Sequence, residues 1–249
     1  MANWVTHLAV TDKLYEMGIN LDERGFAVGN IAPDCNVEEN EEWTKFNPPR
    51  EITHWMNGDS KLTADYESFY EACIKDKEFI SNEKRAFFWG YYSHLITDVE
   101  MQKFFRDEER VKEIYLRIKQ NDKMYGRIKN MPENYDTLKE VFGRNNFAAA
   151  FIVPETEYLR KNPNSRYNTI IKETHCFPDY IDYLPHGAIV RKIVIMPGGY
   201  RPGMLVNEMQ EYIYFNQNEF NSFIENTSSL VYKLMRKKRY TTRKNKHDI

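Results

Sequence analysis

Hydrophobic residues recur at helical spacing through most of the first 150 residues. The clearest stripe lies between 81 and 105, where intervals of four and three residues alternate along one set: Phe87, Tyr91, His94, Asp98, Met101 and Phe105. This spacing places its members on one face of an α-helix. Ser81, with Glu83 close behind it, is typical of a helix N-terminus. The same pattern predicts helices over 3–18, 22–28, 50–57, 60–76, 107–119 and 133–149.

The pattern changes between 151 and 204. The segment "VPETEYLRKNPNSRYN" is typical of a loop, and "GAIVRKIVIMPGGYRPG" is β-branched with glycine and proline behind it, which predicts a small hairpin or an extended excursion. Helical spacing returns over 206–238. Because no repeat or low-complexity linker divides the chain, we expect one all-α, multi-helix domain over 1–238 with an irregular insertion around 151–204.

The charge is distributed unevenly over the 249 residues. The formal net charge is −2, but residues 233–249 hold eight lysines and arginines against one aspartate. Their basic end, 239–249, is expected to be a flexible tail. It is either a solvated terminus or a peripheral contact for an anionic membrane surface or nucleic acid. Tyr240 is the one aromatic residue among these charges, which disfavours nucleic acid.

The lack of a recognisable targeting signal, together with the cysteine count, leads us to expect a cytoplasmic protein. The first residues lack a basic start followed by an apolar run, and the chain has no run of 18 apolar residues. Three cysteines, Cys35, Cys73 and Cys176, are an odd number, so we expect reduced thiols.

His94 and Asp98 are polar residues on the otherwise apolar stripe of the helix at 81–105. A buried carboxylate has to be neutralised, paired or bound to a metal, since an isolated buried charge costs several kcal/mol. One interpretation is therefore a His94–Asp98 pair that satisfies itself in the core.

Three further polar residues extend this pattern. His7 lies on the apolar side of the first helix, Asp34 follows Pro33 in the loop "GNIAPDC", and His54 stands beside Trp55 in "EITHWM". Imidazole and carboxylate groups are ligands of Zn²⁺, and ligands on different helices converge in the core of a bundle. The spacing is thus compatible with a metal site as well as with a core ion pair.

Four segments, taken in order, carry a resemblance to a known family: "THLAV", "VGNIAPDC", "ITHW" and "GYYSHLITDV". They resemble the zinc-dependent phospholipase C family, which is related to the S1/P1-type nucleases, over about residues 4–105. The resemblance implies an all-helical domain with metal ions in a cleft between helices. It also implies hydrolysis of a phosphate ester.

Carried over residue by residue, the resemblance implies five metal ligands: His7, Asp34, His54, His94 and Asp98. Zn²⁺ is the expected cofactor, with two ions that Asp98 would bridge. Two metals would stabilise the attacking and the leaving oxygens, and Asp34 or Asp98 would accept the proton of the activated water as the catalytic carboxylate.

The chain departs from the family pattern at several positions. His7 lies too near Met1 for the N-terminal tryptophan ligand of the phospholipases, and Phe104 replaces a further histidine, so a third ion lacks ligands. Cys35 replaces an aromatic residue of the headgroup pocket, so choline-lipid specificity does not carry over. His175 and Asp179 stand four apart, as do the family's later histidine and glutamate, which makes His175 an additional candidate ligand.

Taken together, the sequence predicts a zinc-dependent phosphoesterase acting on phosphodiester or phospholipid-like substrates. An HD-type phosphohydrolase is a weaker alternative because its adjacent His-Asp pair occurs here only as His247-Asp248 in the tail. The second alternative is a non-catalytic, metal-containing helical domain that binds a partner through 151–204 or the basic tail.

Overall fold

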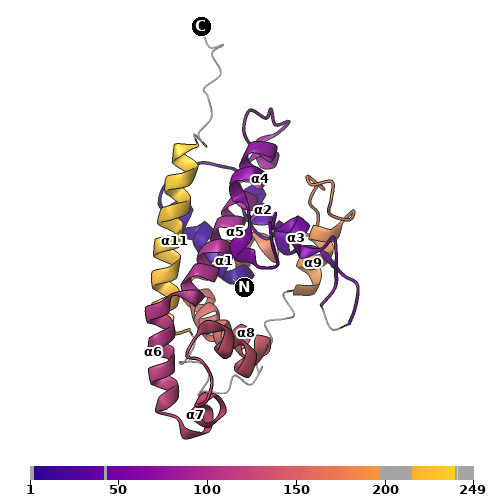
Figure 1. Cartoon of the computed structure of the whole chain (residues 1–249). Coiled ribbons are helices and arrows are strands. Elements are labelled where there is room, and N and C mark those ends of the chain that lie inside the picture. The colour runs from indigo at the N-terminus through magenta and orange to yellow at the C-terminus, as the bar shows by residue number, and fades with distance from the viewer. Residues whose placement is uncertain (1–2, 42–43, 197–214, 239, 241–249) are drawn as a thin grey trace.

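One long helix, α5 (Asn82–Arg106), forms the centre of the computed structural model. The structure describes residues 3–41, 44–196, 215–238 and 240, without the side chains of 142–150. Helix α5 begins at Ser81, whose hydroxyl accepts a hydrogen bond from the Lys84 amide. Most of its residues between Ala86 and Met101 are buried, so the hydrophobic core of the molecule surrounds this helix (Figure 1).

Three helices pack around α5. They are α1 (Trp4–Glu16), α2 (Glu23–Gly29) and α11 (Gln217–Lys237). Helix α11 runs beside α1 and α5 (Figure 1), and it begins with a capping box in which Asn216 and Glu219 satisfy each other's backbone amides. These contacts cover the apolar faces that the sequence pattern predicts.

Helices α2 and α5 approach each other backbone to backbone. A methyl group added to Gly29 would overlap the Phe87 carbonyl, and one added to Gly90 would overlap the Phe26 carbonyl. Glycine is thus required by close packing at these positions, and not by an unusual backbone angle. The contact fixes the position of α5 relative to the loop that follows α2.

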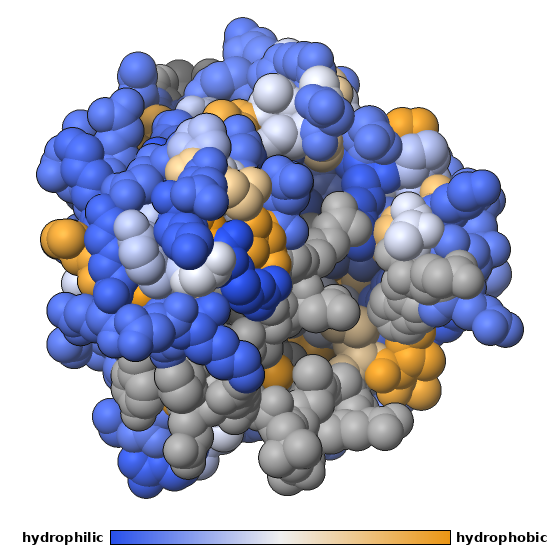
Figure 2. Space-filling model, turned by 60° about the horizontal axis from the view of Figure 1, so that its bottom comes forward, coloured by the Kyte–Doolittle hydropathy of each residue, from blue (hydrophilic) through white to orange (hydrophobic). Residues whose placement is uncertain are grey.

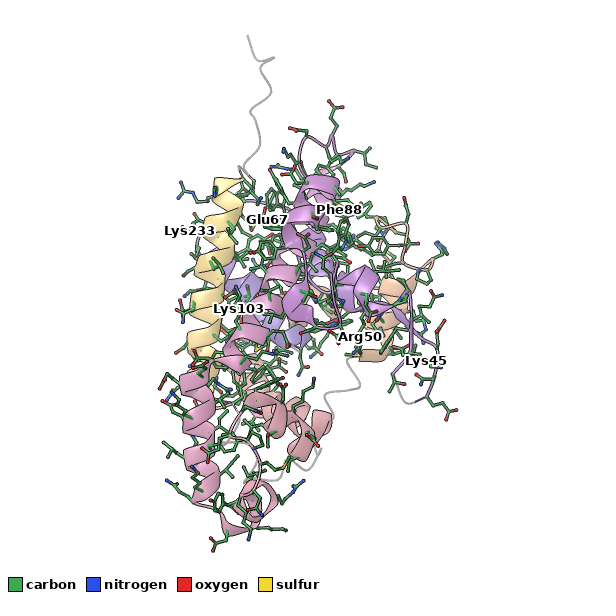
Figure 3. The ribbon with its side chains drawn as sticks, viewed as in Figure 1. Lys45, Arg50, Glu67, Phe88, Lys103 and Lys233 are labelled. Atoms are coloured by element: carbon green, nitrogen blue, oxygen red, sulfur yellow. The ribbon has the colours of Figure 1, made fainter. Side chains whose placement is uncertain are left out.

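Short elements cover one side of α5 (Figure 1). They are the 3₁₀ turn η1 (Ala32–Asp34), the antiparallel pair β1 (Val37–Glu38) and β2 (Phe46–Asn47), helix α3 (Arg50–Thr53), the 3₁₀ turn η2 (Lys61–Thr63) and helix α4 (Tyr66–Cys73). In Figure 3, Phe88 and Lys103 lie towards the two ends of α5, and Arg50 marks the start of α3.

The remaining elements follow α5 in the chain. They are α6 (Glu108–Lys119), α7 (Asp122–Ile128), α8 (Tyr135–Lys161), the π-helical turn η3 (Tyr167–Ile171) and α9 (Ala188–Ile195). The predicted all-α class is confirmed, because the two-residue strands β1 and β2 form the one named sheet in the described residues.

The predicted loop at 153–168 is wrong in its first half, because α8 continues to Lys161 through Pro154. Glu155, the next residue, is fully buried and accepts hydrogen bonds from the Thr6 amide and the Asn3 side chain at the start of α1. This tertiary contact stabilises a helical segment that proline would otherwise disfavour.

The possible hairpin is also wrong where the structure describes it, because residues 188–195 form helix α9. Ile189 and Ile193, one helical turn apart, are both buried, so the β-branched residues cover a helix face against the core. Residues 197–204, and the predicted helical residues 206–214, lie outside the described part of the chain.

The predicted tail, 239–249, lies outside the described residues except for Tyr240. The Tyr240 ring is 4% exposed and packs edge-on against Trp89, with 6.5 Å between centroids. Among the described residues, no helix is long and apolar enough to span a membrane. On the face shown in Figure 2 the surface is mainly hydrophilic, with separate hydrophobic spots.

Candidate metal centre

Three buried residues from α1 and α5 form the first donor set: His7, His94 and Asp98. The His7 and His94 rings stack with 3.8 Å between their centroids. His94 Nε2 lies 3.2 Å from Asp98 Oδ2, as expected for residues four apart on one helix face. His7 Nε2 lies 3.7 Å from the other oxygen, Asp98 Oδ1.

The loop after α2 orients His94. Its Nδ1 atom lies 2.8 Å from the Asn30 carbonyl oxygen, which can only accept, so Nδ1 carries the hydrogen and donates. Nε2 is therefore left as an acceptor that faces Asp98. The Asn30 side-chain amide donates to the His7 carbonyl and to the Thr11 hydroxyl, and this links α1 to the same loop.

The second donor set comes from short elements on the α3 side and shares His94: Asp34, His54 and His94. Asp34 ends the turn η1 directly after Pro33, and His54 follows α3. His54 Nδ1 lies 3.1 Å from the Arg50 carbonyl, so this nitrogen also donates and leaves Nε2 as the acceptor.

The acceptor atoms of both sets converge on one small volume. His54 Nε2 lies 3.2 Å from Asp34 Oδ1, 3.5 Å from Asp98 Oδ2 and 3.4 Å from His94 Nε2. Within each set the ligand atoms lie within 4.8 Å of one another. The structure thus brings together all five residues that the resemblance implied as ligands.

Lys61 is a further residue of this centre, and no periodic pattern in the chain indicates it. It belongs to the turn η2, and its side chain is 6% exposed. Its Nζ lies 2.5 Å from Asp98 Oδ2 and 3.2 Å from Asp34 Oδ1. One ammonium group therefore neutralises part of the charge of two carboxylates.

Burial and nearby charges lower the pKa values of His7, His54 and Asp98, which favours the protonation states that bind metal. Burial lowers the pKa of His7 well below its ordinary value, and burial together with Lys61 lowers the pKa of His54 to about 4. Burial alone would raise the pKa of Asp98, but Lys61 and His94 outweigh it and hold this pKa well below its usual range. Neutral imidazoles and ionised carboxylates are the species that coordinate zinc.

Buried nitrogen and oxygen atoms without hydrogen-bond partners indicate that these residues fit a metal ion. Within the described residues, both ring nitrogens of His7 and the Oδ1 atom of Asp98 are buried without a hydrogen-bond partner. The Nε2 atoms of His54 and His94 offer lone pairs to carboxylate oxygens that cannot donate. Such a cluster of acceptors is stabilised by a cation, and N/O donors of this kind suit Zn²⁺.

The candidate ligand His175 lies elsewhere. It is exposed in an irregular segment and belongs to neither donor set. Pro178 prevents a helix that would align it with Asp179, whose carboxylate instead pairs with His186 and accepts from the Gly187 amide. The prediction of His175 as a ligand is therefore not supported by the geometry.

Two departures from the family pattern are visible in the packing. The partly buried Phe104 ring contacts Phe215 and Phe223, so that position packs against the hydrophobic core. Cys35 is fully buried and its thiol lies 3.3 Å from the Ile31 carbonyl, outside both donor sets. Neither residue offers a ligand to a third ion.

A surface cavity of about 440 Å³ lies beside α3. Its lining includes Ile52 and Trp55, which lie two residues before and one residue after His54, and also Asp65 and Tyr183. The Trp55 indole donates to the Tyr183 hydroxyl at 3.3 Å. An apolar and an acidic surface thus lie next to the α3 side of the centre.

Comparison with known protein families gives a match to part of the chain. The model of the family described as zinc dependent phospholipase C matches residues 5–101, a segment that contains all five residues of the two donor sets. This match confirms the resemblance that the sequence motifs predict over that segment. No curated protein and no solved structure was found to match the chain.

Proposed function

Because residues 5–101 match the zinc-dependent phospholipases C, we propose that this protein is a zinc-dependent phosphoesterase. Phosphodiesters or phospholipid-like esters are its proposed substrates. The observation that carries the proposal is the convergence of His7, His54 and His94 with Asp34 and Asp98 in two adjoining donor sets. The coarse assignment to the hydrolases rests on the family match.

The five candidate ligands have different proposed roles, which follow from how deeply each side chain is buried. Asp98 is fully buried, and its carboxylate lies within 3.7 Å of a ring nitrogen of each of the three histidines, so it contacts both donor sets, which share His94. When bound, zinc supplies a Lewis acid that polarises a phosphoryl oxygen and activates a water molecule. The protein holds its ligands rigidly through the Asn30 and Arg50 carbonyls behind His94 and His54.

Asp34 is the proposed proton acceptor. Its side chain is 20% exposed, whereas His7, His54, His94 and Asp98 are fully buried, so it is the carboxylate of the centre that solvent reaches. Its low pKa, caused by Lys61 and His54 against the opposing effect of burial, keeps it ionised at neutral pH.

Metal analysis and one substitution test this proposal. Protein purified without chelators should contain zinc and hydrolyse a generic phosphodiester such as bis(p-nitrophenyl) phosphate. Asp34→Asn should lower kcat by about 100-fold or more, because general acid–base groups contribute roughly that factor. The fold, measured by circular dichroism, should be retained.

Asp179→Asn is the matched control, since Asp179 is an aspartate on the surface that contacts no residue of the centre. It should leave both zinc content and kcat unchanged. A wild-type protein that binds no transition metal would refute the proposal. So would zinc-loaded protein that hydrolyses no member of a panel of phosphomonoesters, phosphodiesters and phospholipids, and a non-catalytic metal domain would then be the better account.

A further inference from the structure

A positively charged side chain lies inside the metal centre. The Lys61 ammonium contacts Asp98 Oδ2 and Asp34 Oδ1, and each of these oxygens is also within 3.5 Å of His54 Nε2. Lysine is almost never buried without a partner, so these two contacts are what allow Nζ to stay there. The lysine thus already neutralises the two carboxylates through which a metal would be held.

The lysine and a zinc ion require the same oxygen atoms. Zinc binds carboxylate oxygens at about 2.0–2.2 Å. An ion at that distance from Asp98 Oδ2 or Asp34 Oδ1 would lie next to an ammonium that is 2.5 Å and 3.2 Å from the same atoms. Two cations at such separations repel each other strongly in a low-dielectric interior. The two arrangements therefore exclude each other.

The turn that carries Lys61 lies at the surface. Its neighbour Leu62 is 38% exposed, and Thr63 is exposed as well. The turn is held by local hydrogen bonds, in which Ser60 accepts from the Leu62 amide and the Thr63 hydroxyl. The Lys61 side chain thus reaches inward from a turn whose next two side chains face solvent, so we expect that it can leave the centre without repacking of the helical core.

We propose that Lys61 is an internal cation that competes with zinc for Asp34 and Asp98. In metal-free protein its ammonium holds the two carboxylates together. When zinc binds, the ammonium leaves them and moves to the surface, so the lysine weakens the affinity for the metal and stabilises the metal-free fold. This inference rests on the proposed metal centre, but it concerns metal affinity and not catalysis.

Zinc affinity of a neutral variant tests the proposal. Lys61→Met keeps the length of the side chain and removes its charge. Its zinc Kd, measured by competition with a chromophoric chelator, should fall by about tenfold or more relative to wild type. Its metal-free form should unfold at lower urea concentration, because two buried carboxylates lose their cation. Lys61→Arg, which retains the charge, should bind zinc about as wild type does.

Lys192→Met is the matched control, because Lys192 is a buried lysine that pairs with the carboxylate of Glu38 outside both donor sets. It should lower stability without tightening zinc binding. An equal or weaker zinc affinity in Lys61→Met would overturn the role of Lys61 and leave the phosphoesterase proposal standing. Absence of zinc binding in wild type and variants alike would overturn both.

Wild-type protein provides a measurement that does not depend on how the variants fold. Lys61 should react slowly with an amine-acylating reagent in the metal-free state, because its side chain is buried and paired. Zinc should increase its labelling several-fold, measured by mass spectrometry, whereas Lys192 labelling stays constant. A Lys61 reactivity that zinc does not raise would contradict the proposed displacement.

Discussion

His54 shows how burial changes the ionisation of single residues in the centre. Burial and the nearby Lys61 ammonium lower its pKa from 6.5 to about 4, and burial also lowers the pKa of His7. Between pH 6.5 and about pH 4 the histidines of the unfolded chain bind protons that those of the folded chain do not. Acidification in this range therefore favours unfolding. Asp34 and Asp98 contribute in the same direction at lower pH, because their pKa values lie below the usual range.

We therefore expect the chelator-treated protein to lose stability as the pH falls from about 6.5 towards about 4. The loss should be on the order of 1 kcal/mol per pH unit for each of the two histidines, as measured by urea unfolding. His54→Gln should remove part of this slope, and His186→Gln, at a fully exposed histidine, should keep it. An identical slope in both variants would contradict the assignment.

Helix α5 carries two of the ligands, and its contact with α2 positions them. The glycines at this contact let the helices approach until the Asn30 carbonyl accepts from His94 Nδ1 at 2.8 Å. Chain periodicity predicts both helices, but it does not show that they pack through their backbones. The close packing is shown by Gly29 and Gly90, where an added methyl group would overlap a backbone carbonyl of the other helix.

Gly90→Ala should destabilise the protein by about 1–3 kcal/mol, because the added methyl group overlaps the Phe26 carbonyl and the Asn30 amide. It should also weaken zinc binding, since separation of α2 from α5 lengthens the hydrogen bond behind His94. Thermal unfolding and zinc titration measure the two effects.

Gly126→Ala on α7 is the matched control, because nothing lies within 4 Å of the added methyl group. In a helix, alanine is favoured over glycine by about 1 kcal/mol, so this variant should be neutral or more stable. Equal stabilisation by both substitutions would show that α2 and α5 do not need this close contact.

At the scale of the whole molecule, the centre joins segments that are far apart in the chain. His7 comes from α1, Asp34 from η1, His54 follows α3, and His94 and Asp98 come from α5. A ligand that binds the folded chain and not the unfolded one stabilises the fold by mass action. Zinc should therefore stabilise the entire domain as well as the loops around it.

Zinc at about 100 times its Kd should stabilise the protein by about 2.7 kcal/mol and raise the Tm by roughly 5–10 °C. Addition of a chelator should reverse the shift in differential scanning calorimetry. His94→Ala, which removes the residue shared by both donor sets, should abolish the zinc-dependent shift, whereas His175→Ala should retain it. A shift that survives in His94→Ala would place the zinc site elsewhere.

The sequence predicted the parts of this protein that depend on local geometry. The pairing of His94 with Asp98 follows from a four-residue interval on a helix, and the side of α1 that His7 occupies follows from its apolar neighbours. The all-α class and the main helices α1, α2, α5 and α6 follow from the same periodicity. His175 belongs to neither donor set, because a four-residue interval aligns two side chains only inside a helix and residues 174–180 are irregular.

Features that depend on contacts between distant segments of the chain were decided only by the tertiary structure. Helix α8 passes through Pro154 because Glu155 bonds to the start of α1, and 188–195 is a helix because its isoleucines face the core. Lys61 enters the metal centre because η2 packs against α5, a contact that no interval in the chain encodes. Local spacing thus fixed which residues could bind a metal, whereas the long-range packing of α1, α2, α3 and α5 fixed that they meet, with a lysine among them.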